Sequence, residues 1–145
     1  MNWKNEAMEK LRRYEAMKKA VVNIPVELHR LQVEACATRG MSTDQVCLKG
    51  GVSRREERLM NNLVCQQELK WNLDQSRSWI KATEQALKSL TTEERLILQR
   101  LYIYPEKGAV ERLCRELGVE QSTVYRHRDQ ALYKFTTALY GYPES

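Results

Sequence analysis

Side chains that could read DNA are concentrated in one short stretch of this chain. They bring together amide, hydroxyl, phenol and guanidinium groups, at Gln121, Ser122, Thr123, Tyr125, Arg126 and Arg128. On a helix, most of these positions fall on the side opposite an apolar stripe formed by Val124, Ala131 and Phe135. Such a polar face can form hydrogen bonds with base edges in the major groove and with the phosphates beside it.

The expected roles differ along this face. Thr123 and Arg128 are expected to hold phosphates and so fix the register of the helix on the duplex. The other four residues are expected to read base edges, with Arg126 suited to a bidentate pair with a guanine.

The segment just before this face contains the elements that would position it. In Ala109 to Leu117, apolar residues recur at the i, i+3, i+4, i+7 spacing of one helical face, at Val110, Leu113, Cys114 and Leu117. Gly118 follows where the helix must end and the chain must reverse through a positive φ. The pattern predicts two helices joined by a tight corner, although any helical hairpin with an apolar interior shares much of it.

A third helix is predicted directly upstream. Thr91 and Glu94 have the spacing of a capping box, in which each side chain satisfies a backbone donor at a helix start. The buried side of this helix is expected to hold Leu96, Ile97, Leu98 and Leu101. Tyr102 to Gly108 would then form the connection to the next helix.

This order of segments resembles a known family. LTTEERLILQRLY at 90–102, a connector, and ERLCRELGVEQSTVYRHRDQALYKF at 111–135 look like the fourth region of bacterial sigma-70-type factors. They are still more similar to the ArpU/RinA-type regulators of phages that infect Gram-positive bacteria. Two positions depart from the pattern, since Glu120 stands where relatives carry a capping Ser, and His127 where sigma factors carry an aliphatic residue.

The resemblance implies a function as well as a fold. It implies a sequence-specific transcription regulator of phage or prophage origin, with a helix-turn-helix whose recognition helix, about 121–134, enters promoter DNA. Double-stranded DNA would be its main partner, and RNA polymerase a further one. A competing hypothesis is a DNA-packaging protein like a phage small terminase subunit, or another oligomeric structural protein, because such proteins also combine a helix-turn-helix with long helices.

The first 90 residues predict long helices. A helix is expected over residues 2–22, with a break or kink at Asn23–Val26 because Pro25 removes a backbone donor. A second helical piece ends near Gly40, and residues 40–52 predict a loop. Ser53 and Glu56 form a second capping box, and no Gly or Pro interrupts the chain from there to residue 90.

The long helix predicted after Ser53 carries an imperfect heptad pattern. Its apolar positions, supported by Met60, Trp71 and Trp79, are Leu59, Leu63, Leu73, Ile80 and Leu87. Both tryptophans are expected to be packing anchors. Either the N-terminal helices fold back on this stripe, or two subunits pair through it as a homodimer.

The predicted architecture is therefore all-α. Residues 1–90 would form a helical hairpin or coiled-coil arm, residues 91–140 a helix-turn-helix DNA-binding domain like sigma-70 region 4, and residues 141–145 a tail.

Composition narrows the function classes. With 42% hydrophobic and 30% charged residues, the chain is expected to fold. Because no apolar run suggests a membrane span or a signal peptide, a cytoplasmic location is expected. The four cysteines form no CxxC pair and are expected to be small, partly buried apolar residues, so no metal site or cofactor is predicted. The two histidines, His29 and His127, lack a neighbouring nucleophile, which argues against an enzyme.

The net charge of +5 suits an anionic partner, but it is unevenly distributed. Residues 1–58 carry 12 basic against 8 acidic residues, whereas residues 91–145 carry 8 of each. We therefore expect the predicted DNA-binding domain alone to bind with a shallow salt dependence, unless other parts of the protein add phosphate contacts.

Overall fold

The computed structural model describes residues 2–40 and 54–141, and within them every regular element is helical. The predicted all-α class is confirmed for this part of the chain. The predicted loop after Gly40, the capping role of Ser53 and residues 142–145 of the predicted tail lie outside the described residues.

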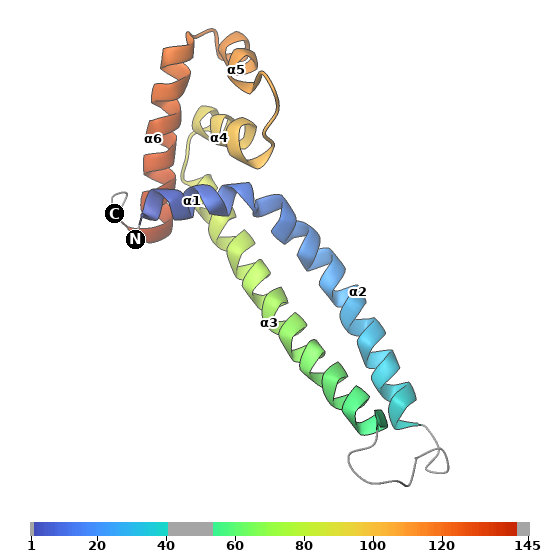
Figure 1. Cartoon of the computed structure of the whole chain (residues 1–145). Coiled ribbons are helices and arrows are strands. Elements are labelled where there is room, and N and C mark those ends of the chain that lie inside the picture. The colour runs from blue at the N-terminus through green and yellow to red at the C-terminus, as the bar shows by residue number, and fades with distance from the viewer. Residues whose placement is uncertain (1, 41–53, 142–145) are drawn as a thin grey trace. The chain divides into compact units, whose positions relative to one another are not determined.

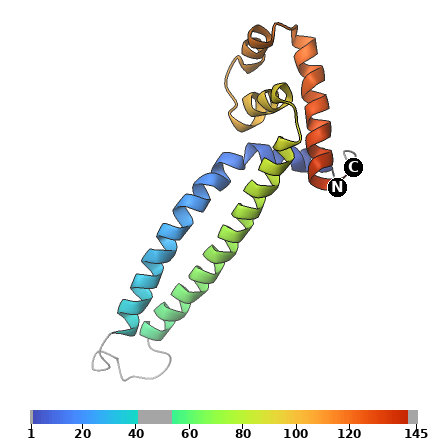
Figure 2. The same ribbon diagram turned by 180° about the vertical axis from the view of Figure 1, so that it is seen from behind.

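The helices follow one another along the chain as shown in Figures 1 and 2. They are α1 (Trp3–Arg12), α2 (Tyr14–Arg39), α3 (Arg54–Lys88), α4 (Thr92–Leu98) with its π-helical continuation η2 (Gln99–Ile103), α5 (Ala109–Leu117) and α6 (Gln121–Tyr140). They pack as two compact units, Lys19–Arg77 and the combination of Met1–Lys18 with Ser78–Ser145. We call these the arm unit and the head unit.

The first helix ends much earlier than the sequence predicted. The break lies at Arg13. Pro25, where a break or kink was predicted, lies inside α2, which continues across this position as one helix. At the break, the indole Nε1 of Trp79 donates to the carbonyl of Lys10 at 3.1 Å. In an unbroken helix this carbonyl would accept from the amide of Tyr14, so the indole satisfies an acceptor that the break leaves open.

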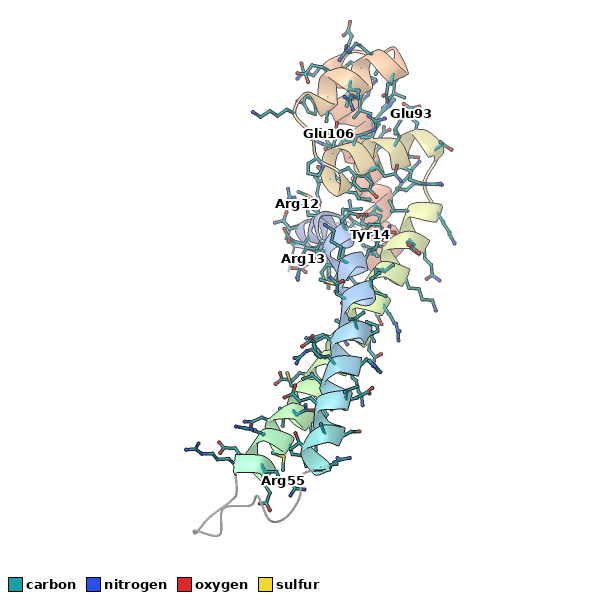
Figure 3. All side chains as sticks on the ribbon, turned by 90° about the vertical axis from the view of Figure 1, so that its right-hand side faces the viewer. Arg12, Arg13, Tyr14, Arg55, Glu93 and Glu106 are labelled. Carbon is teal, nitrogen blue, oxygen red and sulfur yellow. The ribbon has the colours of Figure 1, made fainter. Side chains whose placement is uncertain are left out.

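In the arm unit, α2 and α3 lie side by side and run in opposite directions (Figure 1). Leu28, Leu31 and Ala35 form the buried side of α2. The carbonyl of Leu31 accepts from Nδ2 of Asn62 on α3 at 2.9 Å. Near the other end, Arg55 (labelled in Figure 3) donates to the carbonyls of Thr38 and Arg39, both at 2.9 Å, and so satisfies the C-terminus of α2.

The buried side of α3 is more polar than the predicted heptad stripe. Leu73 and Leu87 are buried as expected, whereas Leu59 and Leu63 are only half-buried. Four polar residues are buried on the same helix, and they are Asn62, Gln66, Ser76 and Thr83. The expectation for Trp71 is wrong in this chain, because its side chain is 63% exposed.

The larger core of the head unit joins segments from both ends of the chain. Ala7, Leu11 and Tyr14 near the start of the chain are buried. They belong to a cluster that is completed by α3, α4, η2 and α6 through Ala86, Leu87, Leu90, Leu98, Ile103, Ala131, Leu132 and Phe135. This unit therefore combines residues from both sides of the predicted boundary at residue 90, because α1 packs against α6.

A hydrogen bond from the first residue of α2 to α3 reinforces this packing. The hydroxyl of Tyr14 donates to Oε1 of Glu84, and Figure 3 marks Tyr14 at this junction. Burial raises the pKa of Tyr14, and the hydrogen bond to the Glu84 carboxylate raises it further.

A second, smaller core holds the C-terminal helices together. Ile97 of α4, Leu113 of α5 and Val124 of α6 have no exposed surface. Partly buried apolar residues surround them, at Leu96, Leu101, Val110, Cys114, Leu117 and Val119. Residues of the predicted apolar faces of all three helices thus pack against one another. The first of these helices continues through η2 to Ile103, beyond Tyr102, where the connection was predicted to start.

The predicted capping box at the start of α4 is confirmed. Oγ1 of Thr91 accepts from the Glu94 amide at 3.2 Å, and Oε1 of Glu94 accepts from the Thr91 amide at 3.3 Å. Thr91→Ala is expected to lower the free energy of unfolding by about 1 kcal/mol, because an N-cap acceptor is lost. Thr91→Ser keeps the hydroxyl and should stay close to the wild type in urea unfolding. Equal losses in the two variants would contradict the assignment.

Candidate nucleic-acid interface

One face of α6 is held by both cores of the head unit, and the opposite face is exposed. Val124 packs in the smaller core, while Ala131, Leu132 and Phe135 pack in the larger one. The exposed residues recur along the other side of the helix, at Gln121, Ser122, Tyr125, Arg126, Asp129, Gln130 and Tyr133. The structure thus brings four of the six predicted site residues onto one exposed surface, which we call the outer face of α6.

A glycine corner sets the start of α6 relative to α5. Gly118 has φ of 67° and ψ of 35°, the left-handed conformation expected for it. The amides of Gly118 and Val119 both donate to the carbonyl of Cys114, which closes the end of α5. Glu120 occupies the N-cap of α6 but makes no side-chain capping bond, and Glu is not among the residues that cap helices well.

Arg126 is the cation of the outer face that is available for a ligand. Its side chain is exposed, and it makes no hydrogen bond or ion pair with any residue that the structure describes. The nearby phenol of Tyr125 is 36% exposed and accepts from Nε2 of Gln121 at 3.1 Å. The amide and phenol thus keep further hydrogen-bonding capacity, because each can form more than one hydrogen bond.

The two residues expected to hold phosphates lie at the margin of the outer face. Thr123 and Arg128 are each half-buried. Nε and Nη2 of Arg128 donate to Oδ1 of Asp129 at 3.2 and 3.0 Å, and its guanidinium lies 5.0 Å from the ring centre of Tyr125. The position of Arg128 beside the exposed residues is compatible with a flanking phosphate contact.

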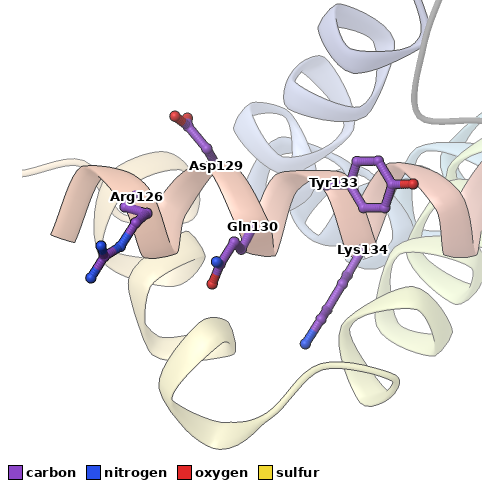
Figure 4. A pocket seen from close by; sticks show the side chains of 5 residues that line it. All are labelled: Arg126, Asp129, Gln130, Tyr133 and Lys134. Atoms are coloured by element: carbon purple, nitrogen blue, oxygen red, sulfur yellow. The ribbon is translucent and has the colours of Figure 1, made fainter. Parts of the chain in front are cut away.

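The outer face also continues along α6 beyond the predicted site residues, which end at Arg128. The side chains of Arg126, Asp129, Gln130, Tyr133 and Lys134 line an open groove of about 640 Å³ (Figure 4). The signal for this extension was present, because positions 126, 130 and 133 continue the helical spacing of the predicted face.

Two acidic residues of α4 form polar contacts with the side of α6 that borders this groove. Nδ1 of His127 lies 3.0 Å from Oε1 of Glu93 (labelled in Figure 3), and Nζ of Lys134 donates to Oε1 of Glu94 at 3.0 Å. Burial alone would raise the pKa of Glu94, but hydrogen bonds from Lys134 and Thr91 outweigh it and hold this pKa below its usual value.

This lowered pKa gives the fold a dependence on pH. Because Glu94 binds its proton less readily in the folded state, its contribution to stability is present above the unfolded pKa and is lost as the pH falls through the folded one. We expect urea unfolding to show a loss of stability as the pH falls below 4.5, the ordinary pKa of a glutamate, and this loss should be smaller in Glu94→Gln. Lys134→Met should also reduce this loss. An unchanged pH profile in both variants would contradict the role of the pair.

Other kinds of site find little support in the described part of the chain. No group of three or more His, Cys, Asp or Glu residues there could hold a metal ion. Cys36 and Cys65 are exposed rather than partly buried as expected, Cys114 is half-buried, and Cys47 lies outside the described residues. None of the described helices combines the length and apolar character needed to cross a membrane.

Comparison with known proteins adds no relative, since no family model, curated protein or solved structure matches this chain. The geometry of α4, α5 and α6 is therefore the basis for assigning a function.

Proposed function

We propose that this protein is a sequence-specific DNA-binding transcription regulator. In this proposal, α5, the corner at Gly118 and α6 act as a helix-turn-helix, with the outer face of α6 in the major groove. The resemblance to ArpU/RinA-type phage regulators and to sigma-70 region 4 points to promoter DNA as the target, with RNA polymerase as a further partner.

The observation that carries the proposal is the contrast between the two sides of α6. One side has no exposed surface at Val124, Ala131 and Phe135, so the helix is rigidly held. The other side presents the free guanidinium of Arg126 among amide, hydroxyl and phenol groups. An α-helix together with its side chains is about 10–12 Å wide, and it therefore fits a major groove about 12 Å wide.

The length of α6 also suits this role. Its 20 residues correspond to a rod of about 30 Å, so that its first turns could read bases while its later turns remain anchored in the larger core. Arg126 lies in the second turn, where recognition helices of helix-turn-helix proteins commonly contact base edges.

Selection of bound duplexes from a random DNA pool tests the proposal directly. We expect the purified full chain to enrich a defined sequence motif, and a reporter gene placed behind that motif to respond to the protein. Enrichment without any shared motif, or no retained DNA at all, would contradict sequence-specific binding.

A further inference from the structure

An acidic side chain interrupts the outer face of α6. Asp129 is exposed there, and a lone carboxylate on this face would repel the phosphates of a bound duplex. Figure 4 shows its carboxylate pointing away from the guanidinium of Arg126, the cation proposed to read a base. Whether Asp129 opposes or assists DNA binding therefore depends on its other neighbours.

The partner of Asp129 is the preceding residue, Arg128. Nε and Nη2 of Arg128 donate to Oδ1 of Asp129 at 3.2 and 3.0 Å, and Asp129 makes no further hydrogen bond or ion pair with a residue that the structure describes. A guanidinium has five N–H donors, and these two bonds leave three of them free, one on Nη2 and both on Nη1. Nη1 and Nη2 thus keep a parallel pair of N–H groups, the arrangement that binds two oxygens of a phosphate.

Tyr125 is a second neighbour of the same guanidinium. The Cζ atom of Arg128 lies 5.0 Å from the ring centre of Tyr125, within reach of a cation–π interaction. The ring is itself tethered, because its hydroxyl accepts from Nε2 of Gln121 at 3.1 Å. A carboxylate and an aromatic ring therefore hold Arg128 together.

These contacts orient Arg128 more than they stabilise the fold. The side chains of Arg128 and Asp129 are 31% and 54% exposed, and ion pairs in such surroundings contribute little to the free energy of unfolding. An arginine that is already held in one conformation, however, loses less side-chain entropy when it binds a phosphate. The benefit of the pair is therefore expected in ligand binding.

We propose that Asp129 is a positioning residue, which holds the guanidinium of Arg128 so that its Nη1 and Nη2 donors meet a backbone phosphate of the DNA. This inference rests on the proposed function. It gives the acid on the outer face a role in binding, although its charge alone would oppose binding. Because phosphates carry no sequence information, the contribution should be the same for any duplex.

Asp129→Ala in the full chain tests the inference through the sign of its effect. Affinities for the selected duplex and for a scrambled one are measured at low salt, where weak variants still bind. We expect Asp129→Ala to bind both duplexes about three- to tenfold more weakly, although it removes a negative charge, because the released arginine must be ordered on binding. Asp129→Asn keeps an oxygen that accepts from the guanidinium, and it should lose less affinity than Asp129→Ala.

A double-mutant cycle shows whether Asp129 acts through Arg128. In an Arg128→Ala background, Asp129→Ala should not weaken binding, because only the repulsion by the acid is then removed. Glu120→Gln is the matched control, since Glu120 is an exposed acid at the start of α6 without a side-chain capping bond, and it should not weaken binding either. The melting temperature of Asp129→Ala should stay at the wild-type level or above it.

Four outcomes would overturn the inference alone. Asp129→Ala could bind as tightly as the wild type or more tightly, or weaken binding equally in the Arg128→Ala background. A lower melting temperature of Asp129→Ala would make its role structural. Weakening confined to the selected duplex would mean that the carboxylate reads a cytosine amino group instead. A wild type that retains no duplex would overturn the proposed function as well.

Discussion

Phe135→Ala is expected to lower the free energy of unfolding by about 3–5 kcal/mol. Phe135 has no exposed surface and packs in the larger core, where α1, the end of α3, η2 and α6 meet. Its removal would leave a cavity among segments that come from both ends of the chain. Because the same packing fixes α6, we also expect the variant to bind DNA poorly at temperatures near its melting point.

The matched control for this prediction lies on the same helix. Tyr133 is 57% exposed on the outer face, and Tyr133→Ala should change the unfolding free energy by no more than about 0.5 kcal/mol. Urea unfolding followed by circular dichroism measures both variants. Similar stabilities for Phe135→Ala and Tyr133→Ala would mean that α6 is not anchored as described.

Arg126→Ala is expected to weaken binding to the selected duplex by about 1–3 kcal/mol and to relax the preference at one base pair. The reason is that Arg126 has no partner among the described residues and projects from a rigidly held helix, so its donors are available to a guanine. Stability should remain at the wild-type level, since no internal contact of the described chain is lost.

A second substitution separates base reading from simple charge attraction at this position. Arg126→Lys keeps the positive charge but cannot make the planar, two-pronged contact with a guanine. We expect it to bind scrambled DNA as well as the wild type does, while losing most of the preference at the same base pair. Competition titrations with duplexes that vary at that position measure the effect. A full preference in Arg126→Lys would show that Arg126 acts only through its charge.

Local features of the head unit were predictable from the sequence because each depends on a few neighbouring residues. The capping box of Thr91 and Glu94 and the left-handed Gly118 are set by short-range hydrogen bonds and by backbone sterics. The exposed outer face of α6 follows in the same way from helical spacing.

The features that were missed depend on contacts between distant segments. The break at Arg13 coincides with an indole hydrogen bond from Trp79, a residue far along the chain, whereas the local signal at Pro25 suggested a different position. Asn62 can be buried because it donates to the carbonyl of Leu31, whereas a heptad pattern predicts only apolar residues at buried positions. The proximity of Arg12 to Tyr102 depends on how α1 packs on η2 and could not be read from periodicity.

Chemical protection of the selected duplex tests the central claim most directly. Dimethyl sulfate modifies guanine N7 in the major groove and adenine N3 in the minor groove, so it distinguishes the two surfaces of the DNA. We expect the wild-type protein to protect guanine N7 within the motif, and Arg126→Ala to lose that protection at one guanine while the remaining pattern persists. Protection confined to adenine N3, or guanine protection that is identical in the wild type and Arg126→Ala, would contradict the placement of the outer face of α6 in the major groove.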